Sequence, residues 1–155
     1  MKINTRYFGE VEINPKEAIS FSEGLFGFEA EKEFVLIPFD GEDSIYCLQS
    51  LINPQLAFIV LNPFQLLPLY APKLSNSELS DLNATSSTEL FYYVISVLRE
   101  PFQNTTVNLK CPIALNPEVK KAKQIILENE NYSMRETIIS IEEKDAEKEG
   151  SSCSY

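Results

Sequence analysis

The apolar residues of this chain come in short runs, each nine residues or shorter, that stop at turn-forming residues. Four Asn-Pro pairs mark several of these stops. Proline has no backbone N–H to give to a sheet ladder, so each pair is expected in a turn between strands. Their spacing is irregular, which indicates turns and not a repeat. The pairs are Asn14-Pro15, Asn53-Pro54, Asn62-Pro63 and Asn116-Pro117.

The runs themselves have the residue types of β-strands. Ten Phe and seven Tyr stand beside only five Gly, a balance that favours strands over a glycine-rich loop protein. Residues 19–21 alternate apolar and polar, whereas longer runs are apolar on both faces and predict strands covered on both sides. The predicted strands cover residues 3–7, 11–13, 19–21, 34–39, 45–51, 57–61, 90–98, 105–109, 111–115 and 124–127.

Turns and one helix signal complete the predicted fold. Gly9 and the acidic loop at residues 40–43 each join two strands into a hairpin. Ser75 and Glu78 have the spacing of a capping box and predict a short helix over 75–83. With 155 residues the chain is long enough for one core. The sequence predicts a mainly β, single-domain, antiparallel β-barrel-like fold with one or two short helices.

The last fifteen residues differ in composition from the rest. Residues 141–155 are rich in Glu and Asp and end in small polar residues, so they hold almost no apolar surface to bury. We therefore expect a domain over residues 1–140 and an acidic, disordered tail over 141–155. Removal of the tail is expected to leave the fold unchanged.

The charge of the chain restricts its partners. Thirteen Lys and Arg against 23 Asp and Glu give a net charge of -10, which repels phosphate backbones and anionic lipids. Direct binding to nucleic acid or membranes is not expected. The cluster Lys120, Lys121 and Lys123 is interpreted as an exposed connection before a strand, because no aromatic residues are interleaved with it. The N-terminus lacks the continuous apolar stretch of a signal peptide, so a soluble cytoplasmic protein is expected.

Most catalytic chemistry is missing from the sequence. The chain has no histidine, which excludes Ser-His-Asp and Cys-His arrangements and imidazole catalysis. No glycine-rich phosphate loop is present, because Gly24 and Gly27 are the closest pair of glycines. Cys47, Cys111 and Cys153 have no metal-ligand spacing, and Cys47 and Cys111 are interpreted as small core residues. No enzyme activity, cofactor or metal is expected.

Two alternatives from other functional classes stay open. A carboxylate-based hydrolase requires two acids at a fixed separation, and three groups of acids occur, at residues 29–33, 42–43 and 128–130. An acidic chain produces such groups by chance. A small-molecule carrier requires a sizeable apolar cavity inside the barrel.

Two groups of motifs resemble the flagellar assembly factor (FliW) family. Phe8-Gly9 and residues 19–28 (ISFSEGLFGF) resemble its opening signature, which 48–50 (LQS) and 58–63 (FIVLNP) continue. Residues 108–117 (NLKCPIALNP), 120–127 (KKAKQIIL) and 132–135 resemble its closing signature. Phe26 stands where the family usually has proline, and Cys111 where alanine is common.

The resemblance implies a fold and a function. It implies a mostly antiparallel β-barrel-like domain that is a monomer when free and has two protein partners. FliW-type proteins bind the translational repressor CsrA, which relieves repression of flagellin messenger RNA, and they also bind new flagellin. Flagellin that accumulates before export would then capture the factor, free CsrA and stop flagellin synthesis.

Five residues are predicted to touch the partners. Phe26 and Phe28 form a turn with two closely spaced aromatic rings, and Asn116, Lys123 and Gln124 form a polar strand edge. The alternative is that both rings plug a barrel end and that Asn116 only initiates a turn.

Overall fold

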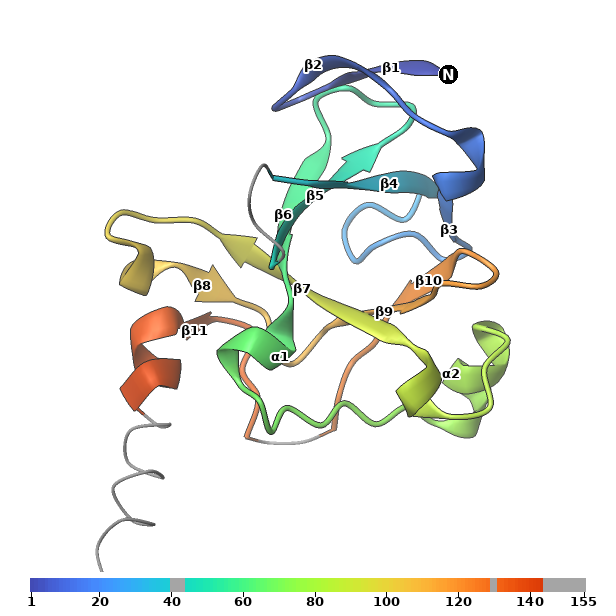
Figure 1. The fold of residues 1–155 in the computed structure, drawn as a ribbon. Coiled ribbons are helices and arrows are strands. Elements are labelled where there is room, and N and C mark those ends of the chain that lie inside the picture. Colours follow the sequence, from blue (N-terminus) through green and yellow to red (C-terminus); the bar gives the residue numbers. More distant parts are fainter. Residues whose placement is uncertain (40–43, 129–130, 144–155) are drawn as a thin grey trace, which may run out of the picture.

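The computed structural model describes residues 1–39, 44–128 and 131–143. Seven strands close into a barrel in the order β7-β6-β5-β4-β3-β10-β9, with β9 paired back to β7 (Figure 1). The pairs in this ring are antiparallel except β3 with β10, which is parallel. The predicted β-barrel-like fold is therefore confirmed, with one parallel exception. The barrel strands are β3 (Ile19–Phe21), β4 (Glu33–Pro38), β5 (Ile45–Ser50), β6 (Ala57–Leu61), β7 (Phe91–Val97), β9 (Ile113–Asn116) and β10 (Lys121–Gln124).

Short strands and helices lie outside the seven-stranded barrel. Two further strands extend the sheet beyond the barrel. β8 (Thr106–Val107) pairs with the C-terminal end of β7, and β11 (Glu136–Thr137) pairs with β8. Among the described residues, the helices before residue 138 are α1 (Pro63–Leu66), α2 (Asn76–Asp81) and the 3-10 turns η1 (Pro15–Glu17), η2 (Ser87–Glu89) and η3 (Phe102–Asn104). The predicted capping box of α2 is confirmed, because Ser75 and Glu78 each accept the other's backbone N–H.

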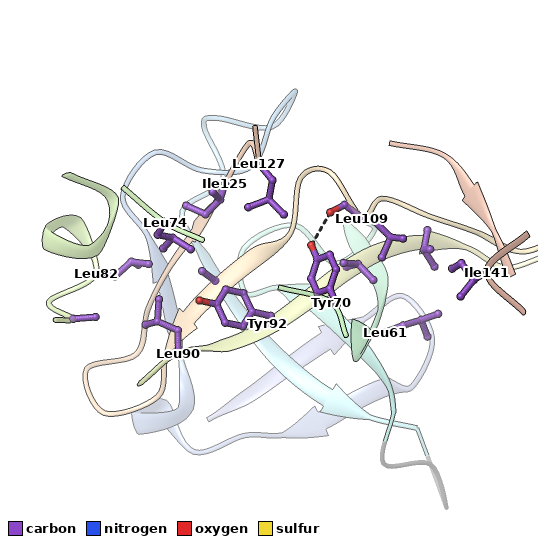
Figure 2. Close-up of a cluster of buried hydrophobic side chains, with 14 of the residues drawn as sticks. Leu61, Tyr70, Leu74, Leu82, Leu90, Tyr92, Leu109, Ile125, Leu127 and Ile141 are labelled. Atoms are coloured by element: carbon purple, nitrogen blue, oxygen red, sulfur yellow. Dashed lines mark hydrogen bonds between the residues drawn. The ribbon is translucent and has the colours of Figure 1, made fainter. Parts of the chain in front are cut away.

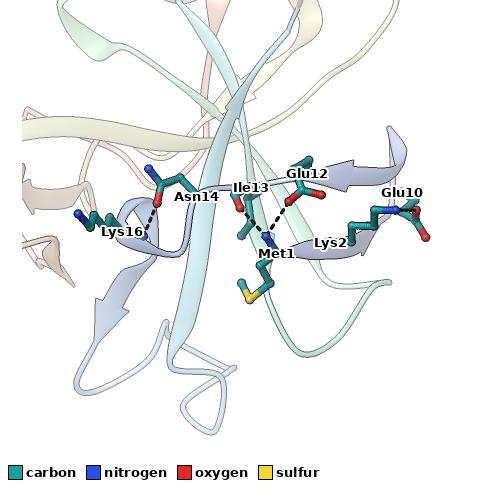
Figure 3. A network of polar contacts seen from close by, with 7 residues as sticks. All are labelled: Met1, Lys2, Glu10, Glu12, Ile13, Asn14 and Lys16. Carbon is teal, nitrogen blue, oxygen red and sulfur yellow. Dashed lines mark hydrogen bonds and ion pairs between the residues drawn. The ribbon is translucent and has the colours of Figure 1, made fainter.

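The N-terminal hairpin covers one side of the barrel. It consists of β1 (Lys2–Thr5) and β2 (Gly9–Glu12), as predicted around Gly9. The amino group of Met1 donates to Glu12 Oε1 at 2.8 Å and to the carbonyl of Ile13 at 3.1 Å, which ties the two ends of the hairpin together (Figure 3). The Lys2–Glu10 ion pair lies on the exposed face, where it adds little stability.

The strands of the barrel bury apolar side chains on both faces, as their sequences predicted. In β4, Phe34 points into the barrel interior, whereas Val35 packs under the hairpin with Ile3 and Ile13. The interior receives side chains from all seven barrel strands, and a central cavity of about 10 Å³ remains. A cavity of this size is about that of one water molecule, so this part of the described interior does not supply the sizeable cavity that a small-molecule carrier requires.

A third cluster of buried apolar side chains, which we call the outer cluster, lies on the outer face of β7 and β9. Figure 2 shows it, with Tyr70 donating a hydrogen bond from its hydroxyl to the carbonyl of Leu109. The segments between α1 and β7 and after β10 cover this face with Leu74, Leu82 and Leu127. Cys111 and Cys47 are both buried, which confirms their interpretation as core residues, and burial raises the pKa of the Cys47 thiol to about 11.

The four Asn-Pro pairs adopt one common turn geometry. In each, the Asn side-chain oxygen accepts the backbone N–H of the second residue after it, at 3.0 to 3.1 Å. The Asn side chain thereby replaces a backbone acceptor, and the proline that follows has its own φ angle fixed by its ring. The predicted turns are confirmed. The hydrogen bonds are Lys16 N to Asn14, Gln55 N to Asn53, Phe64 N to Asn62 and Glu118 N to Asn116.

The described residues form more short helices than the one or two predicted, and two further parts of the sequence-based prediction differ from the structure. Residues 121–124 form β10, whereas the prediction placed the strand at 124–127 and an exposed connection before it. Lys121 and Lys123 are strand residues because β3 and β9 supply a ladder on each side. Residues 138–143 are helical, and Ile141 lies beyond the expected domain boundary yet packs in the outer cluster. The rest of the expected tail, and the loop at 40–43, lie outside the described residues.

The buried position of Ile141 gives a stability prediction. Ile141 is 3% exposed and Ile139, in the same helical turn, is 43% exposed. We expect Ile141→Ala to lower the free energy of unfolding by about 2 kcal/mol, because it leaves a cavity in the outer cluster. Ile139→Ala is the matched control and is expected to change it by less than about 0.5 kcal/mol. Urea unfolding of both variants tests this, and equal effects would contradict it.

Among the described residues, no helix combines the length and the apolar character that crossing a membrane requires.

Candidate protein-binding surface

A loop with two exposed aromatic rings connects β3 to β4. We call residues 22–32 the aromatic loop. Its Leu25 is buried among the side chains of the barrel interior, whereas Phe26 and Phe28 are 49% and 41% exposed. The Phe28 N–H donates to the carbonyl of Leu25 at 2.8 Å, and Gly24 and Gly27 have φ angles of 68° and 87°. The turn therefore places Leu25 inside and both rings outside.

Gln124 holds the aromatic loop against the barrel. Its Oε1 accepts the backbone N–H of Phe26 at 2.9 Å, and its Nε2 donates to the carbonyl of Cys111 at 3.2 Å. The side chain is buried. A buried amide that is satisfied at both ends fixes the backbone it bonds, because release would leave polar groups without partners.

Lys123 fastens the same loop from the outer face. Its Nζ lies 3.3 Å from Glu23 Oε2 in the loop and 2.8 Å from Asp81 Oδ2 at the end of α2. The hydrogen bond to Asp81, and to a lesser extent the one to Glu23, raises the pKa of Lys123. One ammonium group thus joins the loop, β10 and α2.

Asn116 is a buried residue at the C-terminal end of β9, whereas Gln124 pairs with Ile113 at the N-terminal end. Its Nδ2 donates to the carbonyl of Leu82 at 2.7 Å, and its Oδ1 accepts the Glu118 N–H. These bonds join the end of α2 to the turn between β9 and β10. Asn116 therefore initiates a turn, as the sequence-based alternative stated.

Aromatic contacts connect Phe28 to the core. The rings of Phe28 and Phe58 meet edge to face with centroids 5.2 Å apart, and Phe58 lies 6.3 Å from the buried Phe34. Such pairs add about 0.5 to 1.5 kcal/mol beyond area burial. Phe28 is a half-exposed ring on a rigid support, and Phe26 projects beside it without a ring partner among the described residues.

The structure brings four of the five predicted residues to one place. Phe26, Lys123 and Gln124 meet at the aromatic loop, with Phe28 on the same loop, while Asn116 lies at the opposite end of β9. Contact with a partner stays a prediction for all five. The burial of Asn116 and Gln124 favours a supporting role for them over direct contact.

Three residues of this surface were not predicted. Glu23 and Asp81 hold Lys123, and Phe58 supports Phe28. Asp81 is 42 residues from Lys123 in sequence, so no local pattern could have joined them. Every residue of β6 is apolar, so the sequence pattern could not show which face of the strand Phe58 occupies.

The arrangement offers contact surface. Of the acids considered for a hydrolase, Glu29 and Glu33 are exposed, and Glu31 accepts a hydrogen bond from Ser50 Oγ at 3.1 Å. Residues 42–43 and 130 lie outside the described residues. Within the described ranges, no three His, Cys, Asp or Glu side chains gather to hold a metal ion.

Comparisons with known proteins agree with this fold. The profile of the family described as FliW protein matches residues 2–138. The flagellar assembly factor FliW of Geobacillus kaustophilus is 39% identical over 135 residues, which cover 87% of this chain and 93% of that protein. The flagellar assembly factor FliW of Oceanobacillus iheyensis is 36% identical over 147 residues, covering 95% of this chain and all (100%) of that protein.

A solved structure is similar as well. The crystal structure titled as that of the flagellar assembly factor FliW superposes with a TM-score of 0.83 at 36% sequence identity, and the match covers 89% of this chain and 96% of that one. Sequence and backbone both match over nearly the whole described chain, so this chain belongs to the FliW family of flagellar assembly factors.

Proposed function

We propose that this protein is a non-enzymatic, cytoplasmic assembly factor that binds the translational repressor CsrA and flagellin in a partner switch. Binding to CsrA relieves repression of flagellin messenger RNA, and accumulated flagellin captures the factor and frees CsrA. Membership of the FliW family carries this proposal. The half-exposed rings of Phe26 and Phe28 on a loop fastened by Gln124 and Lys123 supply a rigid contact surface for it.

The charge of the chain supports an encounter with CsrA. An RNA-binding protein has a basic surface, so the net charge of -10 attracts it over long range and raises its association rate. A docked acidic protein also places negative potential near the RNA path. CsrA can therefore be inhibited without its RNA site being occupied.

The partner switch is tested by competition. Flagellin is titrated into a preformed complex of this protein with CsrA, and surface plasmon resonance follows the release of CsrA. We expect release, and we expect the CsrA association rate to fall strongly with salt, because the Debye length shortens from about 10 Å at 0.1 M to about 3 Å at 1 M. A stable ternary complex with unchanged CsrA affinity would exclude the switch, and a salt-independent association rate would exclude the steering.

The aromatic loop is tested by one pair of matched variants. Phe26 and Phe102 are similarly exposed, at 49% and 45%, but Phe102 lies in the β7–β8 connection, away from the loop. We expect Phe26→Ala to weaken binding of CsrA or flagellin by about tenfold, the size expected for an aromatic anchor. Phe102→Ala should change it less than about twofold. Equal effects of the two variants would remove the loop from the interface.

A further inference from the structure

The strand β10 continues past its last ladder residue with one edge open. Gln124 pairs with Ile113, and the same antiparallel register continues as Ile125 N bonds to the Pro112 carbonyl at 2.9 Å and Leu127 N to the Lys110 carbonyl at 2.8 Å. Because alternate residues bond toward one side, the N–H and carbonyl of Ile126 face the other side. On that side β3 pairs with Lys121 and Ala122, and its Ser20 N–H bonds to the Lys120 carbonyl, so its ladder ends before Gln124.

The backbone of Ile126 makes no hydrogen bond within the described chain. A strand edge with unpaired N–H and carbonyl groups is a template for another strand. Ile126 itself is 55% exposed.

A cleft of about 610 Å³ runs along this edge, and we call it the edge cleft. Its second wall is the segment before α2, which has no regular secondary structure and in which the backbone of Lys73 also makes no hydrogen bond among the described residues. Leu74 and Leu127, both in the outer cluster of Figure 2, form part of its lining. The lining residues are Ala71, Lys73, Leu74, Ser75, Glu78, Ile126, Leu127 and Glu128.

The chemistry of the walls selects an extended peptide. Unpaired backbone groups on both walls match the main chain of a strand, whose hydrogen bonds give affinity in strand addition. The volume lies within the range of about 300 to 1,000 Å³ typical of ligand sites. Glu78 and Glu128 line the cleft against Lys73 alone, so the net charge favours a basic occupant.

We propose that the edge cleft binds an extended, basic segment of another protein, which adds as a strand along residues 124–128. This site uses the edge of β10 and not the rings of the aromatic loop. It therefore does not depend on the proposed binding of CsrA and flagellin. It gives the protein a second interaction surface.

The test uses a defined peptide and amide hydrogen exchange. The probe is acetyl-Val-Lys-Val-Lys-Val-amide, added to the full-length ¹⁵N-labelled protein. We expect exchange of the Ile126 N–H to slow at least tenfold at saturation, whereas the Leu127 N–H, already bonded to Lys110, stays unchanged. The same peptide with its three Val amides N-methylated, and an acidic peptide with Glu in place of Lys, should each bind at least tenfold more weakly.

Two variants separate strand addition from adventitious binding. Ile126→Pro removes an N–H that bonds nothing in the described fold, so it should abolish peptide binding and leave the urea midpoint unchanged. Glu128→Lys should weaken binding of the basic peptide at least threefold, because it removes a negative charge from the cleft and leaves the backbone of Ile126 unchanged. This variant provides the test if Ile126→Pro does not fold. Unchanged exchange at Ile126, or binding that survives both variants, overturns the proposal. Protection of Ile126 that grows with protein concentration alone would overturn it in favour of pairing between two copies.

Discussion

Replacement of Gly24 by alanine is expected to destabilise the protein by about 3 kcal/mol, because two penalties add. The φ angle of Gly24 is 68°, a conformation that costs a residue with a Cβ about 1 kcal/mol. A Cβ at this position would also lie 2.6 Å from the Cα of Glu29, which is backbone and cannot rotate away. The aromatic loop would have to shift to relieve this contact.

Gly27→Ala is the control for the Gly24 variant. Gly27 has a φ of 87° in the same loop, but a Cβ there would meet nothing within 4 Å. It should therefore lose only the conformational term, about 1 kcal/mol. Urea unfolding of the two variants measures the difference. If both lose the same free energy, the close approach of Gly24 to Glu29 does not hold in solution.

The sequence pattern predicted β4, β5 and β6 well, because each contains a continuous apolar run. In β4, β5 and β6 both faces are buried, so continuous apolar runs marked them to within one or two residues. The prediction failed for β10, because its Lys121 and Lys123 lie on the outer face and one of its two ladder partners, β3, is distant in sequence. Tertiary pairing, and not the residues of β10 themselves, makes it a strand.

The packing of Ile141 was not predicted, because the residues around it are rich in acids. Ile138 and Ile141 are spaced three apart and both enter the outer cluster, which is the pattern of one helical face. The acids that follow them outweighed this short signal in the sequence. The segment is too short to form a helix alone, so its order depends on the cluster it packs against.

The candidate site was only partly predictable, for a similar reason. Gly24 and Gly27 bracket a turn in the sequence, and this pattern located the exposed Phe26 and Phe28. It could not show that Gln124 is buried beneath them, since a polar residue at a strand end is usually exposed. The contacts that join the loop to β10 and α2 connect residues far apart in sequence, so only the folded structure shows them.

A second large effect is expected from the buried side chain of Gln49. It is 0% exposed, its Oε1 accepts the N–H of Arg6, and its Nε2 lies 3.1 to 3.3 Å from four carbonyl oxygens in residues 50–56. This amide holds the N-terminal hairpin and the β5–β6 connection together. Gln49→Leu should lower the free energy of unfolding by about 3 kcal/mol, because buried groups on both sides lose their partner. Gln55→Leu, at an exposed position of the same connection, should change it by less than about 0.5 kcal/mol.

Gln49→Glu tests the same amide by its pH dependence. A carboxylate there would face the four carbonyl oxygens, and burial together with these dipoles should raise its pKa in the folded state. A raised folded pKa means that the variant is closest to the parent in stability at low pH, where the carboxyl is protonated in both states. The deficit should grow as pH rises above about 4.3, the unfolded value for Glu, and level off once the folded carboxyl ionises. Urea unfolding of parent and variant at pH 4.5, 6 and 8 measures it, and a constant deficit would show that water reaches the side chain at position 49.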